Sequence, residues 1–289
     1  MNQEKEWIWL SKIDGLGSKK IQALLKKYPN ISDIPKLKKE ELIQVEGIQE
    51  KLAEKILDKK YRENIEKYLE YMQKQDIKII NYFHPNYPEK LKNIYDPPMI
   101  LYVKGDETIL NEFSIGIIGC RECTSYGKEV AYQLSKQLAQ KKVHIISGLA
   151  KGIDSYAHLG CLAAEEKTIA IIGNGLDSCY PAENTLLQEK IWKTGGAVIS
   201  EYLIGTKPEK SHFPARNRII SGISNGLLVV EAKEKSGTLI TVDFALEQGK
   251  NIFAVPGNIT SINSYGTNQL IREGAKIITS VEDILEEYS

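Results

Sequence analysis

The 289-residue sequence lacks a net charge, because 38 lysines and arginines balance 38 aspartates and glutamates. A uniformly basic surface is therefore excluded, and any site for an anion has to be local. No apolar run approaches the ~18 residues that a membrane span needs. The first residues, MNQEKEWIWLSK, also lack the apolar segment of a signal peptide. We therefore expect a cytoplasmic globular protein with no membrane partner.

Cysteine is scarce as well, with four residues in the chain. Cys120 and Cys123 have the CxxC spacing at a predicted strand-to-helix turn, where a redox pair could lie. A zinc site would need two more ligands, but Cys161 and Cys179 are far apart in the sequence and have no paired histidines nearby. We therefore favour small, semi-buried free thiols, and we expect no metal and no cofactor.

The first part of the chain, residues 1–75, has the periodicity of helices. Residues 13–16 (IDGL) and 45–48 (VEGI) repeat a hydrophobic–acidic–glycine–hydrophobic pattern, and each precedes an amphipathic helix. This arrangement resembles a pair of SAM-like helix-hairpin-helix units. Amides at such a glycine turn can bind a DNA phosphate. Packing against a neighbouring surface is the alternative, and the sequence leaves both open.

The rest of the chain has a different rhythm. Residues 76–110 are expected to connect the two parts through short strands at 77–82 and 99–105 and a proline-rich loop. From residue 111 onward, strands alternate with helices, which is typical of a parallel sheet with helices on both faces. The expected strands are SIGIIG, VHIISG, TIAIIG, AVISEY, GLLVVEA, NIFAVPG and AKIITS, and the expected helices begin near Thr124, Gly152, Glu183, Pro214 and Thr238.

The fold class is therefore α/β, with an extended Rossmann-like domain over 111–289 and a small all-α domain over 1–75. Ligands of such sheets bind at the carboxyl ends of the strands. Four loops at that edge carry candidate residues.

The first loop, in IGIIGCRECTSYG, departs from the G-x-G-x-x-G fingerprint of dinucleotide-binding proteins. Arg121 stands where a nicotinamide-dependent enzyme needs small residues against the pyrophosphate, which argues against a dehydrogenase. A guanidinium at a helix N-terminus suits a phosphate instead. Pairing of Arg121 with Glu122 or with a neighbouring loop is the alternative.

The second loop, in SGLAKGIDSYAH, places Lys151 between two glycines, so this segment can approach a ligand closely. Asp154 and His158 share one helix face at i,i+4 and could form a catalytic dyad. We favour a structural interpretation, in which Asp154 supports the helix start and His158 pairs with it inside the packing.

The third loop, in EKSGTLITVDFALEQG, places Ser236, Gly237 and Thr238 at the start of an amphipathic helix. Hydroxyls and free amides at a helix N-terminus suit an anion. Simple N-capping by Ser236 would need no ligand.

The fourth loop, KSHFPARNR, concentrates cationic side chains around a phenylalanine. Pro214 suits the first position of a helix, so Arg216 and Arg218 diverge around its axis; we expect one at the ligand edge and the other on a structural carboxylate. Lys210 and Phe213 form the combination that holds a single-stranded base, with a ring for the base and an ammonium for the phosphate. A buried hydrophobic staple at Phe213 is the alternative.

Taken together, the four loops supply cations, amides and an aromatic ring. They supply no metal cluster, no nucleophile with a neighbouring base and no pair of acid–base carboxylates. This inventory predicts a polyphosphate-binding protein that is not an enzyme.

The motifs GCRECTSYG, SGLAKGIDSYAH, YPAEN, HFPARNRIISGIS, SGTLITVDFALEQG, FAVPG and GTNQLIREGA follow one another over nearly all of residues 80–289. Their order resembles that of the DprA (Smf) family of bacterial DNA-processing proteins. The resemblance implies an extended Rossmann domain that binds single-stranded DNA without catalysis. It further implies a homodimer that protects incoming strands in natural transformation (competence), loads the RecA recombinase onto them and helps to displace single-strand-binding protein.

By the same resemblance, Arg121 and Lys210 would hold phosphates and Phe213 a base. The further pocket members that it implies are Lys151, Arg216, Ser236, Gly237, Thr238 and Lys250. The chain departs from the family pattern at Cys120, where many relatives have serine. Many relatives also carry a C-terminal winged-helix domain, whereas this chain ends at Ser289.

Two other functions compete with this interpretation. Rossmann-like nucleotide hydrolases of the phosphoribohydrolase type carry the signature PGG-x-GT-x-x-E, with a glutamate that assists at the sugar. This chain keeps Gly237 and Thr238 but has Thr241 where the glutamate would stand. A protein scaffold with a vestigial pocket is the second alternative, which RecA binding without DNA binding would indicate.

Overall fold

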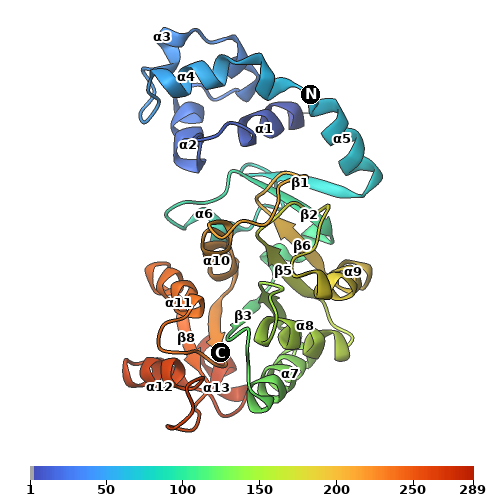
Figure 1. Ribbon diagram of the computed structural model, residues 1–289, viewed down its shortest axis with the longest axis vertical. Helices are drawn as coiled ribbons and strands as arrows, with labels where there is room; N and C mark the ends of the chain where they lie inside the picture. Colours follow the sequence, from blue (N-terminus) through green and yellow to red (C-terminus); the bar gives the residue numbers. More distant parts are fainter. Residues whose placement is uncertain (1–2) are drawn as a thin grey trace.

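The computed structural model describes residues 3–289 and shows a helical N-terminal region above an α/β region (Figure 1). The α/β region contains one nine-stranded sheet in the order β1-β2-β6-β5-β4-β3-β7-β8-β9. The strands are β1 (Ile77–Asn81), β2 (Ile100–Gly105), β3 (Ser114–Ile118), β4 (His144–Ser147), β5 (Thr168–Ile172), β6 (Ala197–Ser200), β7 (Gly226–Val229), β8 (Asn251–Ala254) and β9 (Lys276–Ile277).

The sheet is parallel from β6 to β9, and β1 and β2 extend it as an antiparallel edge. Every residue of β3, β5, β6 and β7 is buried, because helices cover both faces of a parallel sheet. This burial explains why these strands are continuous apolar runs. The segment that was expected to connect the two regions, residues 76–110, supplies β1 and β2.

Two sets of helices cover the sheet. Helices α6, α10, α11 and α12 pack on one face through a shared hydrophobic core, whereas α7, α8 and α13 pack on the other. These helices are α6 (Glu89–Lys92), α7 (Ser125–Gln140), α8 (Ile153–Ala163), α9 (Thr185–Lys193), α10 (His212–Ile223), α11 (Gly237–Glu247), α12 (Tyr265–Arg272) and α13 (Glu282–Leu285). The expected α/β class is confirmed, and the expected helix starts lie within two residues of the observed ones. Helix α10 begins at His212, so Pro214 is its third residue and not its first, and Phe213 lies inside the helix.

The helical region contains α1 (Glu4–Ser11), α2 (Ser18–Lys27), α3 (Lys39–Leu42), α4 (Glu50–Leu57) and α5 (Ile65–Lys74). The repeated glycines form the expected turns, since Gly15 and Gly47 have φ of +88° and +78°, a conformation that favours glycine.

The helical region also shares a core with the edge of the sheet. Trp7 and Met72 belong to the same buried cluster as Ile77 and Tyr102. The Ser11 hydroxyl lies 2.9 Å from the Tyr102 hydroxyl. None of the helices formed by residues 3–289 has the length and apolarity to cross a membrane.

Candidate functional site

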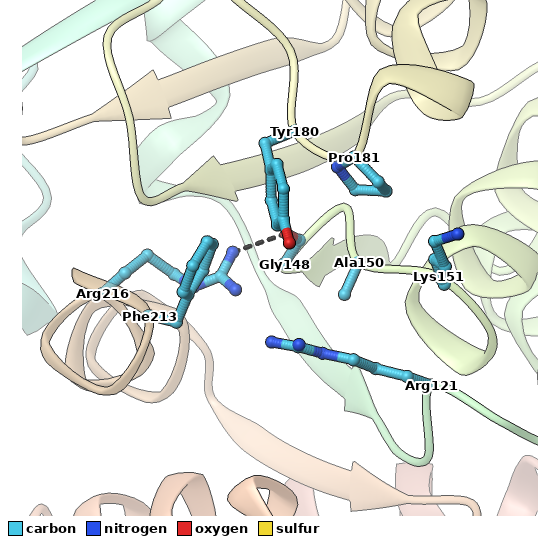
Figure 2. Close-up of a pocket in the computed structure, with 8 residues that line it drawn as sticks. All are labelled: Arg121, Gly148, Ala150, Lys151, Tyr180, Pro181, Phe213 and Arg216. Carbon is cyan, nitrogen blue, oxygen red and sulfur yellow. Dashed lines mark hydrogen bonds between the residues drawn. The ribbon is translucent and has the colours of Figure 1, made fainter. Parts of the chain in front are cut away.

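A pocket opens at the carboxyl edge of the sheet (Figure 2). The residues that line it are Arg121, Gly148, Ala150, Lys151, Tyr180, Pro181, Phe213 and Arg216. They come from the loops after β3, β4 and β5 and from the start of α10. The cavity measures about 50 Å³, room for a few water molecules. A flat ligand would therefore lie on its rim and would not be enclosed.

Arg121 and two aromatic rings form the centre of this pocket. The guanidinium carbon of Arg121 lies 5.6 Å from the centroid of the Phe213 ring, within the range of a cation–π contact. The Tyr180 and Phe213 centroids are 5.3 Å apart. Arg121 is exposed, and Glu122 pairs with Lys233 at 3.2 Å. The alternative of an Arg121–Glu122 pair is therefore wrong.

Phe213 is only partly buried, although it stands at the start of α10. In Figure 2 its ring faces the pocket, next to Tyr180 and opposite the tip of Arg121. This position does not fit the alternative of a buried staple. The ring is available to a ligand that enters from solvent.

The loop after β4 is held in a fixed shape. One carboxylate oxygen of Asp154 accepts hydrogen bonds from the Gly148 and Ala150 amides at 3.1 and 3.3 Å. The side chain of Asn184 donates to the Leu149 carbonyl at 2.8 Å. Gly152 has a φ of +75°, and a Cβ there would lie 2.4 Å from two carbonyl oxygens. The loop therefore requires this glycine.

Lys151 projects from the same loop and ion-pairs with Glu183 at 2.5 Å. Both side chains are more than half exposed, so the pair is open to solvent and worth little in stability. A phosphate could replace the Glu183 carboxylate as the partner of Lys151.

Asp154 and His158 do not form a catalytic dyad. Nδ1 of His158 lies 2.7 Å from the Thr168 hydroxyl, so the expected pairing with Asp154 is wrong. Burial lowers the pKa of His158 to about 3. Burial also raises the pKa of Asp154, against the opposing effect of the Arg216 guanidinium. Both groups are structural.

Arg216 and Arg218 diverge as the helical spacing predicts. Arg216 is 4% exposed and donates to the Gly148 carbonyl at 2.5 Å and to the Ile171 carbonyl. Burial lowers its pKa to about 10, although Asp154 raises it. Arg216 therefore ties α10 to the ends of β4 and β5 and presents only its edge to the pocket.

Arg218 points away from the pocket. It donates to both carboxylate oxygens of Glu201, at 3.0 and 2.7 Å, and its Nε lies 3.5 Å from the Asp96 carboxylate. This is the structural carboxylate that the sequence led us to expect for one of the two arginines.

Lys210 lies in the loop before α10, outside the lining of the pocket. It is exposed, and within residues 3–289 its ammonium forms no hydrogen bond or ion pair. Its ammonium is therefore free to meet a phosphate at the rim.

The structure does not bring four of the expected residues to the pocket. Ser236, Gly237 and Thr238 lie at the start of α11, after β7, and their side chains do not line it. Ser236 does not cap the helix, because its buried hydroxyl has no hydrogen-bond partner in the described chain. Lys250 precedes β8 and so lies at the amino edge of the sheet, where it donates to the Gly222 carbonyl at 3.3 Å.

Three functional features were missed from the sequence. Tyr180 and Pro181 line the pocket, and the YPAEN motif that contains them was the available signal. The third is Glu231, which is 2% exposed. Its carboxylate accepts hydrogen bonds from the backbone amide of Thr124 at 2.9 Å, from the Thr124 hydroxyl and from the side-chain amide of Asn263 at 3.3 Å. A buried carboxylate thus holds the start of α7.

The CxxC residues do not have the environment of a reactive pair. Cys120 is buried and Cys123 partly buried, and both are free thiols. Burial raises the pKa of each, whereas reactive thiols have a lowered pKa. The part of the chain from residue 3 to 289 also holds no cluster of His, Cys, Asp or Glu suited to a metal ion.

Comparison with known proteins agrees with this geometry. The family model described as DNA recombination-mediator protein A matches residues 78–289, and that of the SAM-like helix-hairpin-helix tandem matches residues 10–59. The DNA processing protein DprA of Bacillus subtilis is 48% identical over 74% of this chain and 72% of its own length.

Two solved structures are also similar. The X-ray structure of DprA from Streptococcus pneumoniae has a TM-score of 0.86 at 35% identity and covers 99% of each chain. A structure of DprA from Helicobacter pylori, described for its mode of binding single-stranded DNA, has a TM-score of 0.66 at 30% identity, over 73% of this chain and 95% of its own. The chain therefore belongs to the DNA recombination-mediator protein A family, whose members are named DprA or Smf.

Proposed function

We propose that the protein binds single-stranded DNA at the pocket of Arg121, Phe213 and Tyr180 and catalyses no reaction there. The observation that carries the proposal is the cation–aromatic arrangement at the carboxyl edge, where an exposed guanidinium lies over a partly exposed ring. The similar protein from Helicobacter pylori, which binds single-stranded DNA, supports it.

The chemistry of the pocket suits a strand of any sequence. A base stacks on the ring of Phe213 or Tyr180, and stacking of this kind is worth about 1–3 kcal/mol per base. Arg121, Lys151 and Lys210 offer three cations to the backbone phosphates. Because few phosphates are held at once, the overall neutrality of the chain does not conflict with binding.

The pocket offers little to a nucleotide hydrolase. None of the residues that line it in the described chain is a carboxylic acid. Asp154 is buried behind it and engaged by two amides. Thr241, at the position of the hydrolase glutamate, is buried within α11. These observations support a binding protein.

We further propose that the protein acts as a homodimer that protects incoming single strands during natural transformation and loads RecA onto them. The description of the family as a recombination mediator supports this role. Displacement of single-strand-binding protein would be part of the same step.

The first test is fluorescence anisotropy of a labelled oligonucleotide of about 16 nucleotides, as a single strand and as a duplex, at two salt concentrations. We expect a single-strand preference that weakens as salt rises. Equal, weak binding of both forms would refute the DNA-binding proposal. RecA loading is then measured as RecA ATPase activity on strands coated with single-strand-binding protein, where the scaffold alternative predicts RecA binding without DNA binding.

A further inference from the structure

One of the cation–aromatic pairs outside the pocket joins two parts of the molecule. Tyr95, in the loop between α6 and β2, is 84% exposed, the highest value for an aromatic side chain within residues 3–289. The ammonium of Lys19 lies 2.9 Å from the centroid of its ring. Lys19 belongs to α2, so the pair joins the helical region to the α/β region.

The pair lies on the other side of α10 from the pocket. Helices α6 and α10 pack together and lie next to each other beneath α2 in Figure 1. Asp96, next to Tyr95, meets Arg218, while Arg216 faces the pocket. Two residues along a helix are about 200° apart around its axis. Phe213 and Tyr95 therefore flank the N-terminal half of α10.

The surface between the Arg121–Phe213 pair and the Lys19–Tyr95 pair suits a nucleic-acid strand. The rings of Tyr202 and His212 are stacked with centroids 4.0 Å apart. Lys207 and Lys210 are exposed in the loop that leads to α10. Glu201 is neutralised by Arg218. Glu209, 3.8 Å from His212, and the partly exposed Asp96 are acidic groups close to this surface.

Helix α2, which carries Lys19, is basic. The sequence of α2, SKKIQALLKK, contains four lysines and no acidic residue. A strand that reaches Tyr95 therefore meets the positive charge of α2.

We propose that Tyr95 and Lys19 form a second stacking position for single-stranded DNA. A strand whose base lies on Phe213 crosses the N-terminal end of α10, and a later base stacks on the open face of Tyr95 while Lys19 contacts its phosphate. This inference rests on the proposed DNA binding, and it gives the helical region a direct part in that binding.

The test compares two oligothymidylates, of about 4 and about 16 nucleotides, the range of site sizes of single-strand-binding folds. The longer strand can span α10, which is about 10–12 Å wide with its side chains. We expect Tyr95→Ala to weaken binding of the longer strand about tenfold and to leave the shorter one unchanged. Tyr95→Trp should keep the wild-type affinity, and Tyr71→Ala, at an exposed tyrosine on α5, is the matched control.

A direct readout is photo-crosslinking of a strand that carries 5-iodouracil, followed by mass spectrometry, which should identify the peptide that contains Tyr95. If the wild type does not bind the longer strand at all, the proposed function fails. If it binds through Phe213 but Tyr95→Ala binds both strands as the wild type does, the second position is refuted. Equal losses for both strands would also refute it, because Tyr95 would then act on the first pocket. An unchanged melting temperature shows that each variant is folded.

Discussion

Arg121 and Phe213 should contribute to DNA binding in ways that salt can separate. Arg121 is exposed and free of Glu122, so Arg121→Ala removes one phosphate contact and leaves the fold intact. Phe213→Ala removes a stacking surface and no charge. The first variant should therefore change the salt dependence of binding, and the second should change the affinity alone.

The expected changes in salt dependence and in affinity follow from typical values for one phosphate contact and for one stacked base. Each phosphate contact contributes about −0.7 to the slope of log K against log salt for a single strand, so Arg121→Ala should make the slope about 0.7 less negative. Loss of stacking costs about 1–3 kcal/mol, or about 5- to 150-fold in affinity. Since Arg121 also lies over the Phe213 ring, the double variant should lose about 0.5–1 kcal/mol less than the sum of the two.

The assay is anisotropy of a labelled single strand, titrated at four or more salt concentrations for the wild type, both variants and the double variant. Lys210→Ala should resemble Arg121→Ala, because its ammonium is also exposed. Lys67→Ala, an exposed lysine on α5, is the control and should change nothing. The reasoning is refuted if Phe213→Ala changes the slope as much as Arg121→Ala does, or if neither variant loses affinity.

Two further predictions concern stability. Arg218→Ala leaves the partly buried carboxylate of Glu201, whose side chain is 15% exposed, without its guanidinium partner. It should lower the free energy of unfolding by up to about 3–5 kcal/mol, the range for breaking a buried ion pair; an unchanged urea midpoint would contradict this. Burial lowers the pKa of His158 from 6.5 to about 3, so between these values the unfolded chain binds a proton that the folded chain does not. The free energy of unfolding should therefore fall by up to about 1.4 kcal/mol per unit as the pH drops from about 6.5 towards 3. His158→Asn should lose this part of the pH dependence in urea denaturation at pH 7 and pH 5, and an identical dependence in both proteins would count against the assignment.

Much of the fold was predictable because the strands of a parallel sheet are continuous apolar runs that alternate with helices in the sequence. Apart from the first residues of β4 and β8, the runs that form β3 to β8 are buried on both faces, so their apolar pattern predicts buried strands. The partners of β1 and β2 were not predictable, since two short strands carry no signal for which edge of a sheet they join.

The pocket was predictable in part for a related reason. Arg121, Lys151, Phe213 and Arg216 come together because each follows a strand or begins a helix at the same edge. The prediction that Lys250 belongs to the pocket was wrong because Lys250 precedes β8 and therefore lies at the amino edge of the sheet. Asp154 and Glu231 shape the loops from inside the protein, and their roles depend on amides that only the folded chain brings near them.

The carboxylate of Glu231 has a consequence for what this edge of the sheet can accept. In nucleotide-binding members of this fold class, the amides at the start of the first helix receive the ligand's phosphate. Here the Thr124 amide already has an anion, supplied by the protein's own chain, and Gly127 packs against that carboxylate so closely that a Cβ would lie 2.4 Å from it. The phosphate of a mononucleotide would have to compete for this amide with the Glu231 carboxylate, which is covalently part of the same chain. Under the proposed function, phosphates would be bound by exposed side chains such as Arg121 and not by these amides, an arrangement that suits a long strand better than a small nucleotide.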